Sequence, residues 1–186
     1  MTAIVILSDT AFPVADAIRS EIDSQIQGLE SRCKKPDSTF SDVKSHVQNL
    51  FKRGEPIIAV MASGALIRLL APVLEDKHSE PPVIAVSEDG SSVVPLLGGH
   101  HGANNLARQI ADLLDAHAAI TTAGDLRFGI ALDQPPAGWT LANPENAKPV
   151  MAEILAEGEV RIQGRFVNAA TWLIESKLRA ASRSIR

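Results

Sequence analysis

Residues 56–70 read P-I-I-A-V-M-A-S-G-A-L-I-R-L-L, and this stretch decides the fold. It opens with an unbroken apolar run that is typical of a strand buried on both faces of a parallel sheet. The run ends at a short turn around Ser63 and Gly64, after which Ile67 and Leu70 follow at helical spacing. A buried strand that leads through a tight turn into a helix is the repeating unit of α/β proteins.

The same unit recurs on both sides of this stretch. Strands are predicted at residues 3–7, 56–61, 83–86, 92–97, 118–122 and 160–162, and helices at residues 14–29, 43–51, 65–74, 106–114, 144–158 and 166–178. This order predicts an α/β fold with a doubly wound, mostly parallel sheet that carries helices on both faces, plus a small α+β appendage.

Two local features refine this organisation. Residues 88–90 (E-D-G) form a hairpin-like turn between two predicted strands, and Pro95 suggests that the second of them lies at a sheet edge. The composition shifts at residues 133–139, which are rich in proline and glycine. We therefore expect an amino-terminal domain over residues 1–132 and a small second domain with a C-terminal helix over residues 133–186.

The composition excludes several classes of protein. With 186 residues and 45% hydrophobic content the chain can bury a core without disulfides, and its single cysteine, Cys33, fits an inert thiol in a reducing cytoplasm. The net charge of -4 argues against a nucleic-acid surface. Residues 1–8 are too short an apolar run for a signal peptide or a membrane span. A cytoplasmic protein without nucleic-acid or membrane partners is predicted.

Three glycine-containing turns follow predicted strands, namely Ser63-Gly64, residues 98–102 (G-G-H-H-G) and Gly124-Asp125. If the sheet is parallel, all three lie at one rim, where ligands of such sheets bind. Two of the turns open helices, whose free N–H groups favour an anionic small molecule. The fingerprints of nucleotide sites, the nucleophile elbow and metal-ligand spacing are absent from the sequence.

The polar residues of these turns admit two interpretations each. His100 and His101 are either loop residues that cap a helix or imidazoles that titrate near neutral pH beside a bound ligand. Arg68, Lys77 and Arg127 either neutralise substrate carboxylates or are solvated surface charges. In the same way, Asp125 either orients a histidine or acts as a base, or it forms a turn, and Ser63 is expected to cap a helix.

The segments that carry a family resemblance are residues 61–72 (M-A-S-G-A-L-I-R-L-L-A-P), 76–77 (D-K), 82–90 (P-V-I-A-V-S-E-D-G), 96–104 (L-L-G-G-H-H-G-A-N) and 120–123 (I-T-T-A). In this order and spacing they resemble the amino-terminal domain of the cobalt-precorrin-5A hydrolase (CbiG) family of cobalamin biosynthesis. Residues 138–145, with Gly138-Trp139 and Asn143-Pro144-Glu145, look like the short middle domain of that family.

The resemblance implies an enzyme that opens the lactone ring of an anionic corrinoid intermediate and releases a two-carbon fragment as acetaldehyde. It implies no cofactor, and cobalt enters only as part of the substrate. Under this hypothesis His100 is the general base for water attack on the lactone, and His101 and Asp125 are further catalytic candidates. The substrate-binding candidates are Ser63, Gly64, Arg68, Gly98, Gly99, Gly102, Asn104, Thr121, Thr122 and Arg127.

Three departures from the family pattern keep an alternative open. The turn at residues 98–104 is one glycine shorter than usual, and residues 121–129 look more like the version that is fused to precorrin-3B C17-methyltransferases. The chain also ends before the carboxyl-terminal domain of full-length hydrolases. A separate carboxyl-terminal hydrolase domain would then be a partner. The alternative is a non-catalytic corrinoid-binding or channelling domain that works beside precorrin-3B C17-methyltransferase. A generic nucleotide-binding domain is a third interpretation.

Overall fold

The computed structural model describes residues 1–128, 132, 135, 138–157, 159–160, 173 and 179–180. The chain divides into two compact units, Met1–Ile120 (unit 1) and Thr121–Arg186 (unit 2). Unit 1 ends before the domain boundary expected between residues 132 and 133, and that boundary stays a prediction.

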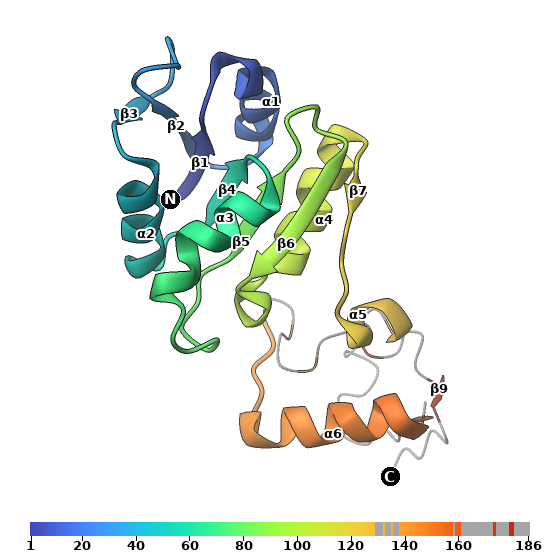
Figure 1. Cartoon of the computed structure of the whole chain (residues 1–186). Helices are drawn as coiled ribbons and strands as arrows, with labels where there is room; N and C mark the ends of the chain where they lie inside the picture. The colour runs from blue at the N-terminus through green and yellow to red at the C-terminus, as the bar shows by residue number, and fades with distance from the viewer. Residues whose placement is uncertain are drawn as a thin grey trace. The chain divides into compact units, whose positions relative to one another are not determined.

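Unit 1 alternates strands and helices along the chain (Figure 1). In chain order its elements are β1 (Thr2–Ile6), η1 (Asp9–Ala11), α1 (Phe12–Glu21), β2 (Ser24–Leu29), β3 (Ser38–Phe40), α2 (Val43–Lys52), β4 (Ile57–Val60), α3 (Ser63–Leu70), η2 (Ala71–Val73), β5 (Val83–Val86), β6 (Ser92–Leu97), η3 (Gly99–His101), α4 (Ala103–Leu114) and β7 (His117–Ala118). The predicted α/β class is confirmed.

The strands form one seven-stranded sheet in the order β3-β2-β1-β4-β5-β6-β7. Strands β1 to β5 are mutually parallel, with Ile4 of β1 opposite Ile26 of β2 and Ile58 of β4. Strand β6 runs antiparallel to β5, and β7 runs parallel to β6. The predicted mostly parallel sheet is therefore correct, and its last two strands run against the others.

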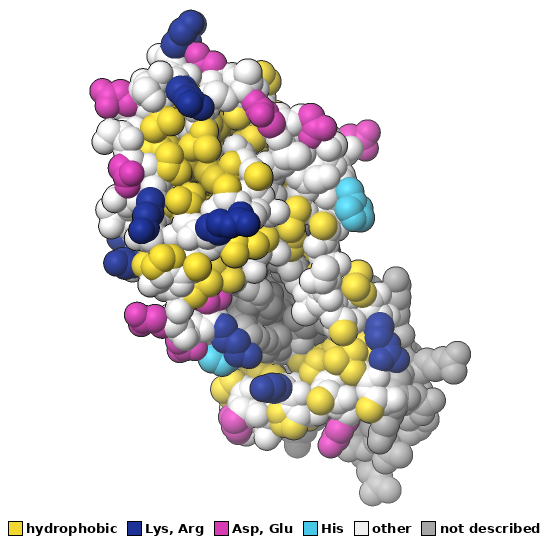
Figure 2. All heavy atoms as spheres, viewed as in Figure 1, with side chains coloured by type: hydrophobic (Ala, Val, Ile, Leu, Met, Phe, Trp, Pro, Cys, Tyr) yellow, Lys and Arg dark blue, Asp and Glu magenta, His cyan; other side chains and the backbone are white. Residues whose placement is uncertain are grey.

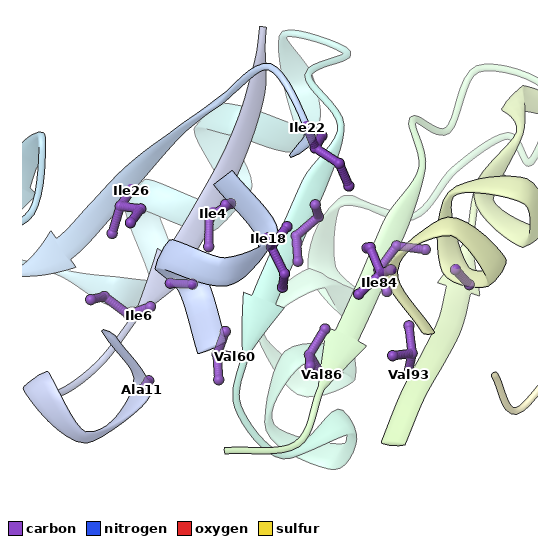
Figure 3. Packing of buried hydrophobic residues seen from close by; sticks show 14 of the residues in the cluster. Ile4, Ile6, Ala11, Ile18, Ile22, Ile26, Val60, Ile84, Val86 and Val93 are labelled. Atoms are coloured by element: carbon purple, nitrogen blue, oxygen red, sulfur yellow. The ribbon is translucent and has the colours of Figure 1, made fainter. Parts of the chain in front are cut away.

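Helices cover both faces of the sheet, which explains why the central strands are apolar throughout. Helices α1 and α4 pack over one face, where Ile4, Ile6 and Ile84 point into a shared core with Ile18 (Figure 3). Helices α2 and α3 pack over the other face against a second core that contains Val5. Because successive side chains of a strand alternate between faces, a strand covered on both sides has no polar position.

The helix predicted over residues 14–29 is wrong in its second half. Helix α1 ends at Glu21 and the chain enters β2 at Ser24. Ile22 and Ile26 are four residues apart, a spacing that fits either period, and pairing with β1 decides the conformation. In β2 the buried Ile26 and Gly28 alternate with the less buried glutamines, as a strand requires.

Strand β6 is not the edge strand that Pro95 suggested, because it lies between β5 and β7. The ladder with β5 is irregular next to Pro95, which lies opposite Ile84, and in the part of the chain that the structure describes β7 pairs with β6 only at Ser92 and Val93. The sheet thus accommodates proline where the ladder on one side is short and that on the other is distorted.

Unit 2 contains α5 (Ala123–Phe128), α6 (Pro144–Glu157), β8 (Glu159–Val160) and β9 (Arg179–Ala180). Phe128 and Ile154 are its buried core. The predicted helix that begins at Pro144 is confirmed, whereas Gly124 and Asp125 lie in a helix rather than a turn. Of the closing helix expected at residues 166–178, the structure describes only Leu173, which is helical.

Candidate functional site

The reversal of β6 separates turns that were expected to share one rim. Ser63 and Gly64 follow β4 at the carboxyl edge of the parallel strands. Because the hairpin after β5 turns the chain round, β6 ends at the opposite, amino edge, where Leu97 lies opposite Val83 at the start of β5. The expectation of one shared rim is wrong for these two turns, and Gly124-Asp125 belongs to unit 2.

The glycine turn at the amino edge is held by its backbone. Gly98 has a φ of 75°, and a Cβ at this position would lie 2.3 Å from the carbonyl oxygen of Pro81. Its own carbonyl accepts hydrogen bonds from the N–H groups of His101 (2.8 Å) and Ala103 (3.2 Å). Gly102, with a φ of 88°, has no neighbour within 4 Å of such a Cβ. Gly98 is thus required by the packing of the turn, whereas Gly99 and Gly102 border open space.

His101 is the described imidazole of this turn. Its side chain is exposed, and its Nε2 lies 2.7 Å from the carbonyl oxygen of His78 in the segment before β5. Because a carbonyl only accepts hydrogen bonds, Nε2 of His101 is the donor in this contact. The backbone of His100 lies in η3, but its side chain is outside the described set, so its predicted role stays a prediction.

Asn104, a further candidate of this edge, lies in the first turn of α4 and is only 7% exposed. The Asn104 side chain is therefore packed inside the protein and offers little surface to a ligand.

At the carboxyl edge, the side chains predicted around α3 are tied to their own helix. Ala62 rather than Ser63 is the N-cap of α3, so the expected capping role of Ser63 is wrong. The guanidinium of Arg68 donates from Nη1 to the carbonyl oxygen of Gly64 at 2.8 Å. This bond places a positive charge, exposed to solvent, over the first turn of α3.

Sequence reasoning missed a chain of polar groups at the same edge. The hydroxyl of Thr10, after β1, donates to the carboxylate of Glu88, after β5, and Thr10 is also hydrogen bonded to the hydroxyl of Ser8. Since β4 lies between β1 and β5, this contact bridges the end of β4. The order of the strands reverses at β1, and such a reversal is where open α/β sheets bind ligands. Ser8, Thr10 and Glu88 follow shortly after the buried strands β1 and β5, and this position in the sequence is the signal that could have identified them.

The next carboxylate along the hairpin, Asp89, has a structural environment. It accepts hydrogen bonds from the Ser87 hydroxyl (2.6 Å) and from the backbone N–H (3.0 Å) and hydroxyl (2.8 Å) of Ser91. These bonds, that from Ser87 above all, lower the pKa of Asp89 to about 2. A carboxylate held in this way stabilises the turn and is a poor proton acceptor near neutral pH.

An open pocket of about 250 Å³ lies at the carboxyl edge between the segments that follow β1 and β2. Its lining residues are Asp9, Phe12, Pro13, Lys34 and Lys35. None of these five residues was among the site candidates expected from the sequence. Cys33, next to Lys34, is buried, and burial raises the pKa of its thiol, which disfavours the reactive thiolate.

The remaining candidates lie in unit 2. Thr121 and Thr122 are exposed, and Asp125 is half-buried in the first turn of α5. The guanidinium of Arg127 donates to the carbonyl oxygen of Leu155 and lies 5.1 Å from the ring centroid of Phe128. Arg127 thus connects α5 to α6 and has a structural role within unit 2.

Among the described residues, no His, Cys, Asp and Glu side chains gather in threes or more in a way that could hold a metal ion. No helix in the described ranges has the length and apolarity needed to cross a membrane.

Comparisons with known proteins agree on one family. Residues 45–125 match the family model described as "Cobalamin synthesis G N-terminal". The chain is 34% identical over 136 residues to a cobalt-precorrin-5A hydrolase from Priestia megaterium, and 43% identical over 93 residues to one from Salmonella typhimurium.

These matches are partial. They cover 72% and 50% of this chain but only 36% and 25% of the two hydrolases, so the chain spans about a third of the length of these relatives or less. A solved structure of a cobalamin biosynthesis protein G homolog from Sulfolobus solfataricus aligns with a TM-score of 0.49 and 23% identity, over 88% of this chain and 48% of the other.

Proposed function

We propose, from the premise that residues 45–125 of this chain are a cobalamin synthesis G N-terminal domain, that the protein binds a corrinoid intermediate of cobalamin biosynthesis and opens its lactone ring. The observation that carries this proposal is the homology to cobalt-precorrin-5A hydrolases. A corrinoid of this pathway carries several carboxylates, and the exposed cations of unit 1 suit such an anion.

The reaction is a hydrolysis. Water adds through its oxygen to the lactone carbonyl carbon and the ring C–O bond breaks, so that the departing oxygen takes up a proton and becomes a hydroxyl. This hydroxyl then loses its proton and becomes the carbonyl of acetaldehyde, while the carbon–carbon bond that joins the two-carbon fragment to the macrocycle breaks and leaves its electron pair on the macrocycle. A general base accelerates the attack by taking a proton from the water. We assign this role to His100, with His101 and Asp125 as further candidates. The exposed side chain of His101 supports a role for the glycine turn, because an imidazole is a common general base.

A second candidate function is a corrinoid-binding or channelling domain without chemistry of its own. It is favoured by the separation of the described candidates, because His101 lies at the amino edge whereas Ser63, Gly64 and Arg68 lie at the carboxyl edge. A catalytic constellation needs its groups within hydrogen-bond reach of one substrate position.

The experiment is to incubate the purified chain with cobalt-precorrin-5A, and to follow both the release of acetaldehyde and the absorption of the pigment. Acetaldehyde above the level without protein supports the hydrolase. His100→Ala is then expected to lower the rate by about 100-fold or more, and His101→Ala by less. His117→Ala is the matched control, because His117 is an exposed histidine of β7, away from the turn.

The remaining outcomes separate the two functions. A spectral change without acetaldehyde supports the binding domain, and the absence of both signals contradicts both. Full activity in a folded His100→Ala protein would show that the base lies elsewhere.

A further inference from the structure

The pocket at the ends of β1 and β2 combines positive charge with an apolar wall. Lys34 and Lys35 lie on one side, and Phe12 and Pro13, the first residues of α1, lie on the other. In Figure 2, basic side chains lie at the top of the view, where Figure 1 shows the loop between β2 and β3, and hydrophobic side chains are exposed below them. No ion pair to either lysine occurs within the part of the chain that the structure describes.

The loop that carries the two lysines is held in place at several points. The Asp9 carboxylate accepts a hydrogen bond from the backbone N–H of Lys34 at 2.9 Å. Asp37 accepts from the backbone N–H of Ile26 and from Nη1 of Arg19, both at 2.8 Å. Gly28 lets the loop approach closely, because a Cβ there would lie 2.7 Å from Cβ of Cys33. The lysines are therefore presented by a fixed loop, which lowers the entropy cost of binding.

The charges indicate the class of ligand. Two ammonium groups outweigh the Asp9 carboxylate, which is already engaged with the backbone of Lys34. The apolar wall suits a hydrocarbon frame, so the pocket fits an organic anion better than a small inorganic one. The amino-terminal end of α1 adds a weaker preference for negative charge.

We propose that this pocket binds a carboxylate arm of the corrinoid through Lys34 and Lys35. This inference rests on the corrinoid binding that both candidate functions share, and it adds a site at the carboxyl edge that precedes the matched residues 45–125. The arm is an acetate or propionate side chain, whose methylene groups contact Phe12 and Pro13 while its carboxylate meets the ammonium groups.

The test measures binding of cobyrinic acid, a corrinoid with free acetate and propionate groups, to the whole chain by calorimetry. The double variant Lys34→Gln/Lys35→Gln is expected to bind about 5- to 10-fold more weakly than the unaltered protein. This difference should shrink as salt is raised from about 50 mM to about 500 mM, because exposed charges are screened. Lys44→Gln/Lys52→Gln, on exposed positions of α2, is the matched control and is expected to bind normally.

The variant Asp9→Asn is expected to change the affinity for the anion in the opposite direction. The amide oxygen can still accept from the N–H of Lys34, whereas the negative charge is gone, so an anion is expected to bind up to about 2- to 3-fold more tightly. Weaker binding in a folded Asp9→Asn protein would contradict an anionic ligand. Thermal unfolding of each variant checks that the fold is kept.

The outcomes distinguish the pocket from the function. If the unaltered protein binds cobyrinic acid and the double-lysine variant binds it equally well, the pocket inference is overturned and the proposed function stands. If the unaltered protein does not bind cobyrinic acid, the pocket inference is overturned, whereas the proposed function is decided separately by the experiment with cobalt-precorrin-5A. ATP binding that depends on Lys34 and Lys35, without any effect of these lysines on cobyrinic acid, would replace the carboxylate arm by a phosphate.

Discussion

The two edges of the sheet present polar groups in different ways. At the carboxyl edge, hydroxyl, carboxylate and ammonium groups come from the segments after β1, β2 and β5 and are organised by side-chain hydrogen bonds. At the amino edge, the backbone of residues 98–102 forms the structure and His101 extends from it. Both edges contain a strand that leads through a glycine turn into a helix, so this pattern alone does not say on which side of the sheet a turn lies.

The largest expected effect is at the amino edge, where Gly98 is packed against backbone. Gly98→Ala should lower the free energy of unfolding by about 2–4 kcal/mol, because the alanine needs a positive φ and its Cβ meets the Pro81 carbonyl, which cannot rotate away. Chemical denaturation measures the change. Gly99→Ala, whose Cβ has no neighbour within 4 Å, is the control and should stay within about 0.5 kcal/mol. Equal stability of the two variants would contradict the packing argument.

A smaller effect is expected at the carboxyl edge, where Gly28 is packed against side chains. Gly28→Ala should cost about 1–3 kcal/mol, since the loop with Cys33 and Pro36 must shift to relieve contacts of 2.7–2.9 Å, whereas no positive φ opposes alanine at this position. The same shift should weaken binding of cobyrinic acid, because the loop carries Lys34. Gly64→Ala is the control, since only the flexible end of Arg68 lies near its Cβ, at 3.3 Å. A loss as large as that of Gly98→Ala would show that the two edges are equally rigid.

The smallest expected effect is the pH dependence of stability that arises from His46, a packed histidine, in contrast to the exposed His101. The ring of His46 is stacked on Phe40, with centroids 4.2 Å apart, and its Nε2 lies 2.7 Å from Oε1 of Gln27. Burial, and then the charge of Arg53, lower the pKa of His46 below its usual 6.5, although Glu55 opposes the shift.

The unfolded chain therefore binds a proton at a higher pH than the folded protein does. The stability that neutral His46 contributes is fully present above pH 6.5 and is lost as the pH falls through the lowered pKa of the folded protein. Urea unfolding between about pH 7.5 and about pH 5 should show this slope, and His46→Phe, which keeps the stack, should reduce it. His117→Gln serves as the control for an exposed histidine, and a slope unchanged in His46→Phe would assign the pH dependence to other groups.

Much of the fold was predictable because it depends on local pattern. The buried strands around Ile4, Ile58 and Ile84 and the helix that begins at Pro144 lie where hydrophobic period and capping residues predicted them. The stretch from Ile22 to Leu29 was not predictable in this way, because its apolar spacing fits a helix as well as a strand and only pairing with β1 decides between them.

The candidate site was predictable in composition but not in arrangement. The glycine turn and its histidines were recognised from the sequence, and the comparisons confirm the family resemblance drawn from the segments around them. The Thr10–Glu88 contact and the pocket of Lys34 and Lys35 were missed, since their residues are far apart in the chain and look like ordinary loop residues.

The sequence by itself determined the α/β class, the central buried strands and the family resemblance, because these depend on residue type and spacing along the chain. Only the tertiary structure decided which loops meet. The direction of β6 sends the turn of His101 to one edge, and the strand order brings the loops after β1, β2 and β5 together at the other. Strand order and direction arise from pairing between distant segments, and the free energy of such pairing is not written in any one stretch of the chain.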